Sequence, residues 1–205
     1  MPLVIENLTV ARGGRTVLRN LSLVVGCGEG VALTGRNGAG KTTLLRTIAG
    51  FVRPDQGHVR FHGERSSEDL LVGEQAHFIG HLDGVKGALT VEENAQFWRV
   101  YFGGASVRVD EALARVGLAD LDRIGARFLS AGQRRRLALA RLLLVVRPLW
   151  LLDEPTASLD AAGQTMLTDM AHAHLTGGGI IVAATHVPLG FSTERELRLD
   201  RAEAA

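Results

Sequence analysis

The sequence contains almost no cysteine, no excess of charge of either sign and no long hydrophobic run. Cys27 is the only cysteine among 205 residues, which excludes an internal disulfide framework and a cysteine-rich zinc site and favours a reducing compartment. The 23 basic and 22 acidic residues leave a formal charge of +1, so bulk charge predicts no nucleic-acid partner. The most apolar stretch is interrupted by Arg141, Arg147 and Pro148, and the first residues lack the pattern of a signal peptide. We therefore expect no segment that spans a membrane.

Lysine is also scarce, because all the basic residues except Lys41 and Lys86 are arginines. Either a site at these positions requires a compact ammonium group, or the excess of arginine is a coding bias. Three of the arginines, Arg134–Arg136, are consecutive, so on a helix they spread around most of the circumference and form no single basic face. We expect them to form a solvated or interdomain surface and not a nucleic-acid patch.

The first part of the chain alternates between strand-like and helical patterns. Strands are expected at 3–10, 16–25, 31–34, 58–62 and 76–80. Glycine-rich turns separate the first three, and a helix is expected at 41–49 after a glycine-rich loop.

The pattern becomes helical from about residue 86 to residue 147. Thr90-Val91-Glu92-Glu93 is a capping box, which predicts a helix that ends near Phe102. Further helices are expected at about 107–116 and from residue 131 onward.

Two short, wholly apolar runs follow this helical segment. The runs at 149–153 and 180–184 have the composition of buried parallel strands, and a helix is expected between them at 160–175. Together with the first part of the chain, this order predicts an α/β nucleotide-binding core with a mostly helical insertion at about 85–145.

The glycine-rich loop at Gly35–Thr42 has the pattern G-x4-G-K-[ST] between an expected strand and an expected helix. Its glycines allow backbone N–H groups to surround phosphate oxygens, and the helix N-terminus adds a favourable dipole. In this pattern Lys41 reaches the β- and γ-phosphates and the Thr42 hydroxyl binds Mg²⁺. A glycine-rich turn without function is the alternative, although chance gives only roughly 0.003 matches in a chain of this composition.

Two adjacent acidic residues end the apolar strand at 149–153. Asp153 at the carboxyl edge of a strand can hold Mg²⁺ through water, and Glu154 beside it can polarise a hydrolytic water. Acidic residues also end strands as solvated caps, so the phosphate loop upstream is what favours the functional interpretation.

A second anion site is expected at Leu129-Ser130-Ala131-Gly132-Gln133. Ser130 is a natural N-cap, and Ala131 and Gly132 present backbone N–H groups at the start of a helix. A self-contained enzyme needs only one phosphate site for each nucleotide. Two complementary sites in one chain predict that each nucleotide lies between two protomers.

The order of these motifs, followed by Ser158-Leu159-Asp160 and His186, resembles the ATP-binding subunit of ABC transporters over essentially the whole chain. The resemblance implies one ATP-binding domain with a P-loop NTPase core and an antiparallel β subdomain at 1–84 and 148–205. A helical subdomain at 85–147 then carries the signature motif. ATP and Mg²⁺ are the implied cofactors, and the implied assembly is a head-to-tail homodimer with two ATP molecules at its interface.

The same resemblance assigns roles to individual residues. It makes Glu154 the general base, His186 the contact to the γ-phosphate and Asp160 a link across the dimer interface. Taken alone, His186 could equally be a surface or core histidine. The residues expected to bind the nucleotide are Gly35, Arg36, Asn37, Gly38, Ala39, Gly40, Lys41, Thr42, Thr43, Ser130, Ala131, Gly132, Gln133 and Asp160. Lys41 is also expected to act in catalysis, and the expected Mg²⁺ ligands are Thr42 and Asp153.

Within the family, Ile79-Gly80-His81, Gly84-Val85-Lys86 and Leu89–Asn94 are similar to the ATPase subunit of the bacterial haem exporter of cytochrome c maturation. This similarity implies that ATP hydrolysis drives transport or release of haem by integral membrane partners. It also implies a peripheral location on the cytoplasmic face of the bacterial inner membrane. The alternatives are the ATPase of another small ABC exporter, a soluble ABC ATPase of DNA repair or translation, and a module that senses ATP without turnover.

Two positions depart from the family pattern. His81-Leu82 stand where the family has a glutamine that touches Mg²⁺ and the membrane subunit; His81 could ligate a metal or be a solvated loop residue, and Leu82 cannot ligate one. Arg12 stands where an aromatic residue usually stacks on adenine, and a guanidinium could stack on the base or point to water. Ala131 also replaces the usual glycine of the signature.

Overall fold

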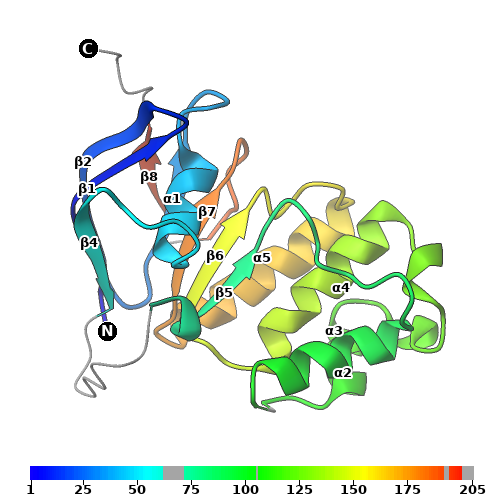
Figure 1. Ribbon diagram of the computed structural model, residues 1–205. Helices are drawn as coiled ribbons and strands as arrows, with labels where there is room; N and C mark the ends of the chain where they lie inside the picture. Colours follow the sequence, from blue (N-terminus) through cyan, green and yellow to red (C-terminus); the bar gives the residue numbers. More distant parts are fainter. Residues whose placement is uncertain (62–71, 105, 192–193, 200–205) are drawn as a thin grey trace. The chain divides into compact units, whose positions relative to one another are not determined.

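The computed structural model describes residues 1–61, 72–104, 106–191 and 194–199, and the chain divides into two compact units (Figure 1). The first unit is formed by Met1–Phe78, Pro148–Pro155 and Ala171–Ala205. The second is formed by Ile79–Arg147 and Thr156–Met170. The first unit holds most of the strands and the second holds most of the helices, as expected for an α/β core with a helical insertion.

A three-stranded antiparallel sheet in the first unit contains β1 (Leu3–Arg12), β2 (Arg15–Val25) and β4 (Gln56–Phe61), in the order β2-β1-β4. Along β1, the buried side chains change parity from Leu3 and Ile5 to Leu8 and Val10. The register shifts between Ile5 and Leu8, where Asn7 has a φ of 50°. This irregularity keeps both halves of the strand facing the core, since a strand buries every second residue.

The second sheet has the strand order β5-β6-β7-β3-β8. Its strands are β3 (Gly30–Thr34), β5 (Ala76–Ile79), β6 (Leu149–Asp153), β7 (Ile180–Ala184) and β8 (Glu194–Arg198). The pairs β3–β7, β3–β8 and β6–β7 are parallel, and every residue of β6 and β7 is buried, which confirms the prediction for these two strands. β8, at one edge of the sheet, was not predicted.

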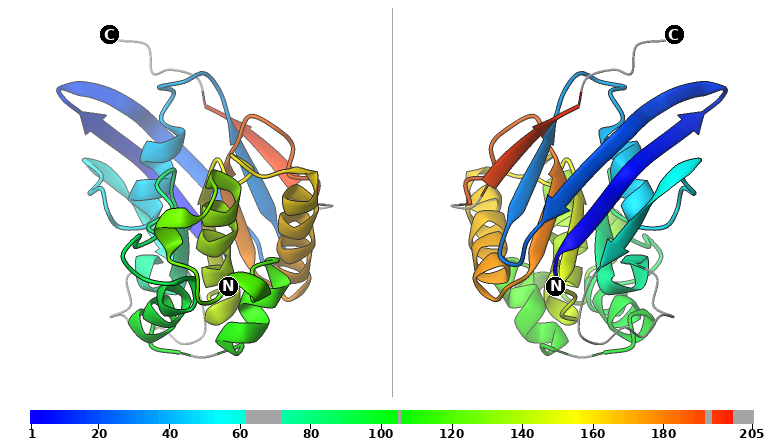
Figure 2. Two further views of the ribbon diagram at one scale, coloured as in Figure 1. Left: turned by 90° about the vertical axis from the view of Figure 1, so that its right-hand side faces the viewer. Right: turned by 90° about the vertical axis from the view of Figure 1, so that its left-hand side faces the viewer.

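The parallel register places three loops at one edge of this sheet. Leu33 of β3 and Asp153 of β6 both pair with Ala184 of β7, so the carboxyl ends of these three neighbouring strands are level. The chain segments that follow them therefore leave the sheet side by side (Figure 2). In open parallel sheets this edge is where ligands bind.

One apolar core joins the elements of the first unit. Helix α1 (Lys41–Ile48) buries Leu44, Leu45 and Ile48 against residues from both sheets. Full burial of one aliphatic side chain contributes about 1.5–3 kcal/mol, so this helix is held mainly by packing and not by its intrinsic helix propensity. Its first residue, Lys41, is thereby fixed relative to β3.

The second unit is built on three helices with their own apolar core, α2 (Val91–Tyr101), α3 (Val109–Arg115) and α4 (Ala131–Leu144). Capping boxes are formed by Thr90 with Glu93 at the start of α2 and by Ser130 with Gln133 at the start of α4. Both caps were predicted as helix starts, and both are confirmed. Short 3-10 turns lie at η1 (Val72–Gln75), η2 (Ala119–Leu121) and η3 (Ala126–Phe128), and helix α5 (Ala161–Thr176) precedes β7.

For Arg134–Arg136 a solvated or an interdomain surface was expected. Arg135 is 3% exposed, so the solvated alternative is wrong for this residue. The helix turns Arg135 to the same side as the buried Leu139 and Leu142, which follow it by four and seven residues. The last residue of the expected strand at 58–62 lies outside the described residues. Within the described parts of the chain, every helix is too short or too polar to cross a bilayer.

A half-buried histidine makes the stability of the first unit depend on pH. The ring of His174 on α5 stacks on Trp150 of β6, with ring centroids 4.0 Å apart and an interplanar angle of 11°. Burial lowers the pKa of His174 from 6.5 to about 4. Between these two values the unfolded chain binds a proton that the folded chain does not bind, so stability falls as the pH falls through this window.

We expect the free energy of unfolding to fall by about 1.5 kcal/mol between pH 6.5 and pH 5 through this histidine alone. Urea titrations of the His174→Gln variant should lack this part of the slope. His172→Gln is the matched control, because His172 lies on the same helix and is exposed. An unchanged slope in the His174 variant would contradict the assignment.

Candidate nucleotide-binding site

The loop between β3 and α1 has a backbone that only glycine adopts readily. Gly35, Gly38 and Gly40 have φ values of 130°, 82° and 104°. A side chain on Gly35 would also overlap the carbonyl oxygen of Leu199. The loop therefore turns tightly just before the N-terminus of α1, the arrangement in which an anion-binding loop presents backbone N–H groups.

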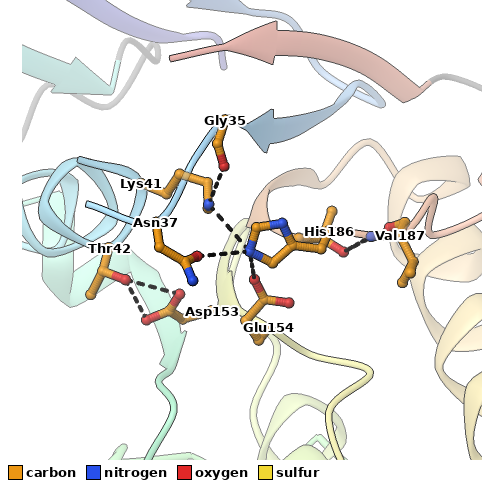
Figure 3. A network of polar contacts seen from close by, with 9 residues as sticks. Gly35, Asn37, Lys41, Thr42, Asp153, Glu154, His186 and Val187 are labelled. Carbon is orange, nitrogen blue, oxygen red and sulfur yellow. Dashed lines mark hydrogen bonds and ion pairs between the residues drawn. The ribbon is translucent and has the colours of Figure 1, made fainter. Parts of the chain in front are cut away.

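Lys41 is the first residue of α1, and its side chain turns back over this loop (Figure 3). It is 8% exposed, and its Nζ donates a hydrogen bond of 2.7 Å to the Gly35 carbonyl oxygen. The same Nζ lies 3.4 Å from Nε2 of His186. The ammonium group is thus held at the mouth of the loop, where it can meet phosphate oxygens.

His186 is the point at which several loops converge. Its Nε2 lies 3.2 Å from Oδ1 of Asn37 in the glycine-rich loop and 3.5 Å from Oε1 of Glu154 after β6. With Lys41, this places an ammonium, an imidazole, an amide and a carboxylate around one point (Figure 3). Such a set can bind a phosphate group on one side and orient a water molecule on the other.

Thr42 and Asp153 form an oxygen-rich pair beside this cluster. The Thr42 hydroxyl lies 3.1 Å from Oδ1 and 3.0 Å from Oδ2 of Asp153, and the Asp153 residue is 6% exposed. Oxygen ligands of this kind suit a hard divalent cation. No group of three or more His, Cys, Asp or Glu side chains that could hold a metal occurs in the described residues. The pair therefore fits a cation that takes its other ligands from phosphate and water.

Glu154 has an unusual backbone conformation. Its φ is 47°, a region that residues other than glycine rarely adopt, and Pro155 follows it. A hydrogen bond of 2.8 Å from its N–H to the Ala184 carbonyl oxygen of β7 fixes this conformation. Strain of this kind persists where the surrounding structure imposes it, and here it directs the carboxylate toward His186.

The second predicted anion site lies at the N-terminus of α4. Oγ of Ser130 accepts a hydrogen bond of 3.1 Å from the Gln133 N–H, and Oε1 of Gln133 accepts one of 2.9 Å from the Ser130 N–H. Gly132 is required between them, because a Cβ there would lie 2.9 Å from the Ser158 carbonyl oxygen. The Ser130 hydroxyl uses a lone pair in this cap, so its own hydrogen can be donated to an anion.

Asp160 is held by α4 within the same unit. Its Oδ1 accepts hydrogen bonds of 2.7 Å from Arg136 and 2.9 Å from the Gly163 N–H. The Arg136 guanidinium lowers the pKa of Asp160. Arg136 therefore fixes the position and the charge of this carboxylate.

Comparison with known proteins identifies the family. The family profile described as ABC transporter matches residues 18–157. The chain belongs to the ABC transporter family. It is an ATP-binding and ATP-hydrolysing subunit, and its fold is that of an ABC ATPase.

The relatives of this ABC ATPase match it almost from end to end. The cytochrome c biogenesis ATP-binding export protein CcmA of Rhodopseudomonas palustris strain HaA2 is 50% identical over 96% of this chain and 97% of its own length. The protein of the same name from Agrobacterium fabrum is 47% identical over 97% of this chain and 95% of its own length. A solved ATP-binding subunit of an ABC transporter, 24% identical, shares the fold with a TM-score of 0.79 over 91% of this chain and 80% of that one.

In this ABC ATPase the predicted residues divide between the two units. The first unit brings together Lys41, Thr42, Asp153, Glu154 and His186. Of the other loop residues, Arg36 is exposed, Ala39 is buried and Thr43 uses its carbonyl oxygen to bind Thr47. Ser130, Ala131, Gly132, Gln133 and Asp160 belong to the second unit.

The positions that depart from the ABC pattern are all solvent-exposed. Arg12 is an exposed residue at the end of β1, before two glycines with positive φ. His81 is exposed, and Leu82 is 86% exposed. Stacking of Arg12 on adenine and metal ligation by His81 therefore stay predictions.

Thr185 is a functional candidate that the sequence analysis missed. It is 1% exposed, its hydroxyl donates a hydrogen bond of 2.7 Å to the Val187 carbonyl oxygen, and it accepts one of 3.1 Å from the Val187 N–H. These two bonds close a tight turn around His186. The sequence offered one indication of this role, namely a threonine placed between an apolar strand and a histidine.

We expect the Thr185→Val variant to lose about 1–2 kcal/mol of unfolding free energy and to hydrolyse ATP more slowly, because both bonds that fix the His186 turn are lost. Urea unfolding and phosphate release measure the two effects. Thr185→Ser keeps the hydroxyl and is the control. If Thr185→Val hydrolysed ATP at the parent rate, the turn would have no part in positioning His186.

Proposed function

We propose that this chain is the ATPase subunit of an ABC exporter that serves cytochrome c biogenesis. The observation that carries the proposal is the similarity to proteins named for that process over nearly the full length of both chains. The cluster of Lys41, Glu154 and His186 supports it, because an exporter subunit must hydrolyse ATP and not only bind it.

The chemistry is a phosphoryl transfer to water. Backbone N–H groups of Gly38 and Gly40 and the ammonium of Lys41 bind the β- and γ-phosphates. Glu154 accepts a proton from the attacking water at its carboxylate, and Nε2 of His186 contacts the γ-phosphate. Thr42 and Asp153 would hold Mg²⁺. When bound, that ion neutralises charge on the phosphates.

The assembly is a head-to-tail homodimer of single ATP-binding domains, in which the first unit is the nucleotide-binding core and the second is the helical subdomain. Ser130–Gln133 of one protomer would complete the site formed by Gly35–Thr43 of its partner. Asp160, held by Arg136, would lie at this interface. The bound nucleotide then forms part of the contact between the protomers, and hydrolysis weakens this contact so that the dimer opens.

The partners are integral membrane subunits, and the location is the cytoplasmic face of the bacterial inner membrane. The helical subdomain and the loop around His81–Lys86 form the surface for these subunits, because loops on a rigid support carry partner contacts. Haem is the substance whose transport or release the hydrolysis would drive, since it is what cytochrome c maturation requires.

Complementation of a host that lacks its own cytochrome c export ATPase tests the function. The parent chain should restore covalently bound haem in c-type cytochromes, detected by haem staining of membranes, and Glu154→Gln should not. Restoration by Glu154→Gln would exclude hydrolysis as the driving step. A complete failure of the parent chain, expressed together with its own membrane subunits, would contradict the proposal.

Size-exclusion chromatography tests the dimer. Glu154→Gln with ATP should elute as a dimer, alone or together with the membrane subunits, and Ser130→Arg should not, because a bulky cation then fills the second anion site. A Glu154→Gln chain that remained monomeric with ATP, even beside its membrane subunits, would contradict a shared site.

A further inference from the structure

The loop after β5 projects from the second unit into solvent. His81 is exposed, Leu82 is 86% exposed, and Gly84 has a φ of 65°. A glutamine at Leu82 could contact both a cation and a partner, but a leucine side chain offers only an apolar contact. A movement of this loop can therefore reach the rest of the second unit only through the side chains that bind the loop.

Arg135 of α4 holds the base of this loop. Its NH1 donates a hydrogen bond of 2.9 Å to the Gly80 carbonyl oxygen and another of 2.9 Å to Oδ1 of Asp83. The Arg135 side chain is 3% exposed and the Asp83 side chain is 24% exposed. A buried guanidinium without partners would be strongly destabilising, so these two hydrogen bonds restrict the loop more than an exposed ion pair would.

A second arginine of α4 lies under the same loop. The guanidinium of Arg141 lies 4.5 Å from the ring centroid of Trp98, and a Cβ on Gly84 would come within 3.1 Å of its NH1. Burial lowers the pKa of Arg141 to about 10, and the charge of Asp83 opposes this shift. Asp83 is thus the carboxylate that faces both buried cations of α4.

The end of the loop is fixed by a buried amide. Asn94 is 0% exposed, accepts a hydrogen bond of 2.8 Å from the Lys86 N–H and donates one of 3.0 Å to the Lys86 carbonyl oxygen. Both ends of the loop are therefore anchored to helices, and between them the exposed His81 and Leu82 are the side chains that a partner can reach.

We propose that Arg135, through Gly80 and Asp83, is the positioning residue that transmits movement of this loop to Ser130. Arg135 follows Ser130 by five residues on one helix, a rise of roughly 7.5 Å, so a displacement of Arg135 displaces the helix N-terminus with it. The inference rests on the proposed function, in which membrane subunits contact the loop and Ser130 completes the ATP site.

Asp83→Asn and Arg135→Lys test this role. The asparagine keeps the shape of Asp83 without its charge, and the lysine keeps the charge of Arg135 without the fork that binds two oxygens. For each variant, kcat and KM for ATP are measured for the isolated chain and for its complex with the membrane subunits. The readout is the ratio of kcat in the complex to kcat in isolation.

We expect this ratio to fall at least fivefold in both variants, while kcat and KM of the isolated chain stay within twofold. Asp110→Asn is the control, because it removes the exposed ion pair with Arg108 in the same unit. An unchanged ratio, or an equal loss of kcat in both preparations, would overturn the coupling role. A parent chain that its membrane subunits neither bind nor stimulate would instead overturn the proposed function.

Discussion

A Glu154→Gln variant is expected to bind ATP like the parent chain and to hydrolyse it about 100- to 10,000-fold more slowly, the range that a general base contributes. The amide keeps the size of the carboxylate but cannot accept the proton of the attacking water. Oε1 of Glu154 lies 3.5 Å from Nε2 of His186, so in the proposed mechanism both groups would face the water that attacks the terminal phosphate. Phosphate release gives the rate, and calorimetry gives the affinity.

The affinity of Glu154→Gln for ATP distinguishes a catalytic role of Glu154 from a structural one. Loss of a negative charge near the phosphates should leave the Kd for ATP unchanged or lower it. A higher Kd together with a lower midpoint of urea unfolding would mean that the strained backbone at Glu154, with its φ of 47°, had relaxed. Glu74→Gln is the control, because Glu74 is an exposed glutamate of the first unit. Hydrolysis by Glu154→Gln at the parent rate would show that Glu154 is not the general base.

The parts of the fold that were predicted are those that local sequence determines. β6 and β7 are continuous apolar runs, and only a strand buried on both faces accommodates such a run in so few residues. The helix starts at Thr90 and Ser130 depend on side chains within three residues of each other. These signals need no knowledge of the rest of the chain.

β8 shows why other parts could not be predicted. Its sequence, Glu194–Arg198, has one apolar residue, Leu197, among charged ones, so nothing local distinguishes it from a surface loop. It is a strand because β3 offers a free edge, with Val31 opposite Arg195 and Leu33 opposite Leu197. Pairing over such a long separation in sequence overrides local preference.

The candidate site divides in the same way. The residues of the glycine-rich loop and the acidic pair were found from motifs, because each motif is contiguous. Their convergence on His186 depends on the register that aligns β3 and β6 on β7. Arg135 was assigned to a solvated or interdomain surface because the three arginines were considered without their helical phase. That phase places Arg135 on the same side of the helix as Leu139 and Leu142.

A Lys41→Ala variant is expected to lose about 100-fold in affinity for ATP. A hydrogen bond to a charged group contributes about 1.5–3 kcal/mol, and in the proposed site the ammonium of Lys41, a residue that is 8% exposed, would face the phosphates. Calorimetry with ATP measures the change. Lys86→Ala is the control, because Lys86 is the only other lysine of the chain and its ammonium lies over the ring of Phe97 in the second unit.

Lys41→Arg separates the charge from the shape of the group. Nζ of Lys41 lies between the Gly35 carbonyl oxygen at 2.7 Å and Nε2 of His186 at 3.4 Å, which leaves no room for a planar guanidinium. We therefore expect Lys41→Arg to lose at least about tenfold in affinity, or about 1.4 kcal/mol, and Lys86→Arg to lose none. Equal affinity in Lys41→Arg would mean that any cation suffices there. The choice of lysine at this position, in a chain with only one other lysine, would then not reflect the needs of the phosphate site.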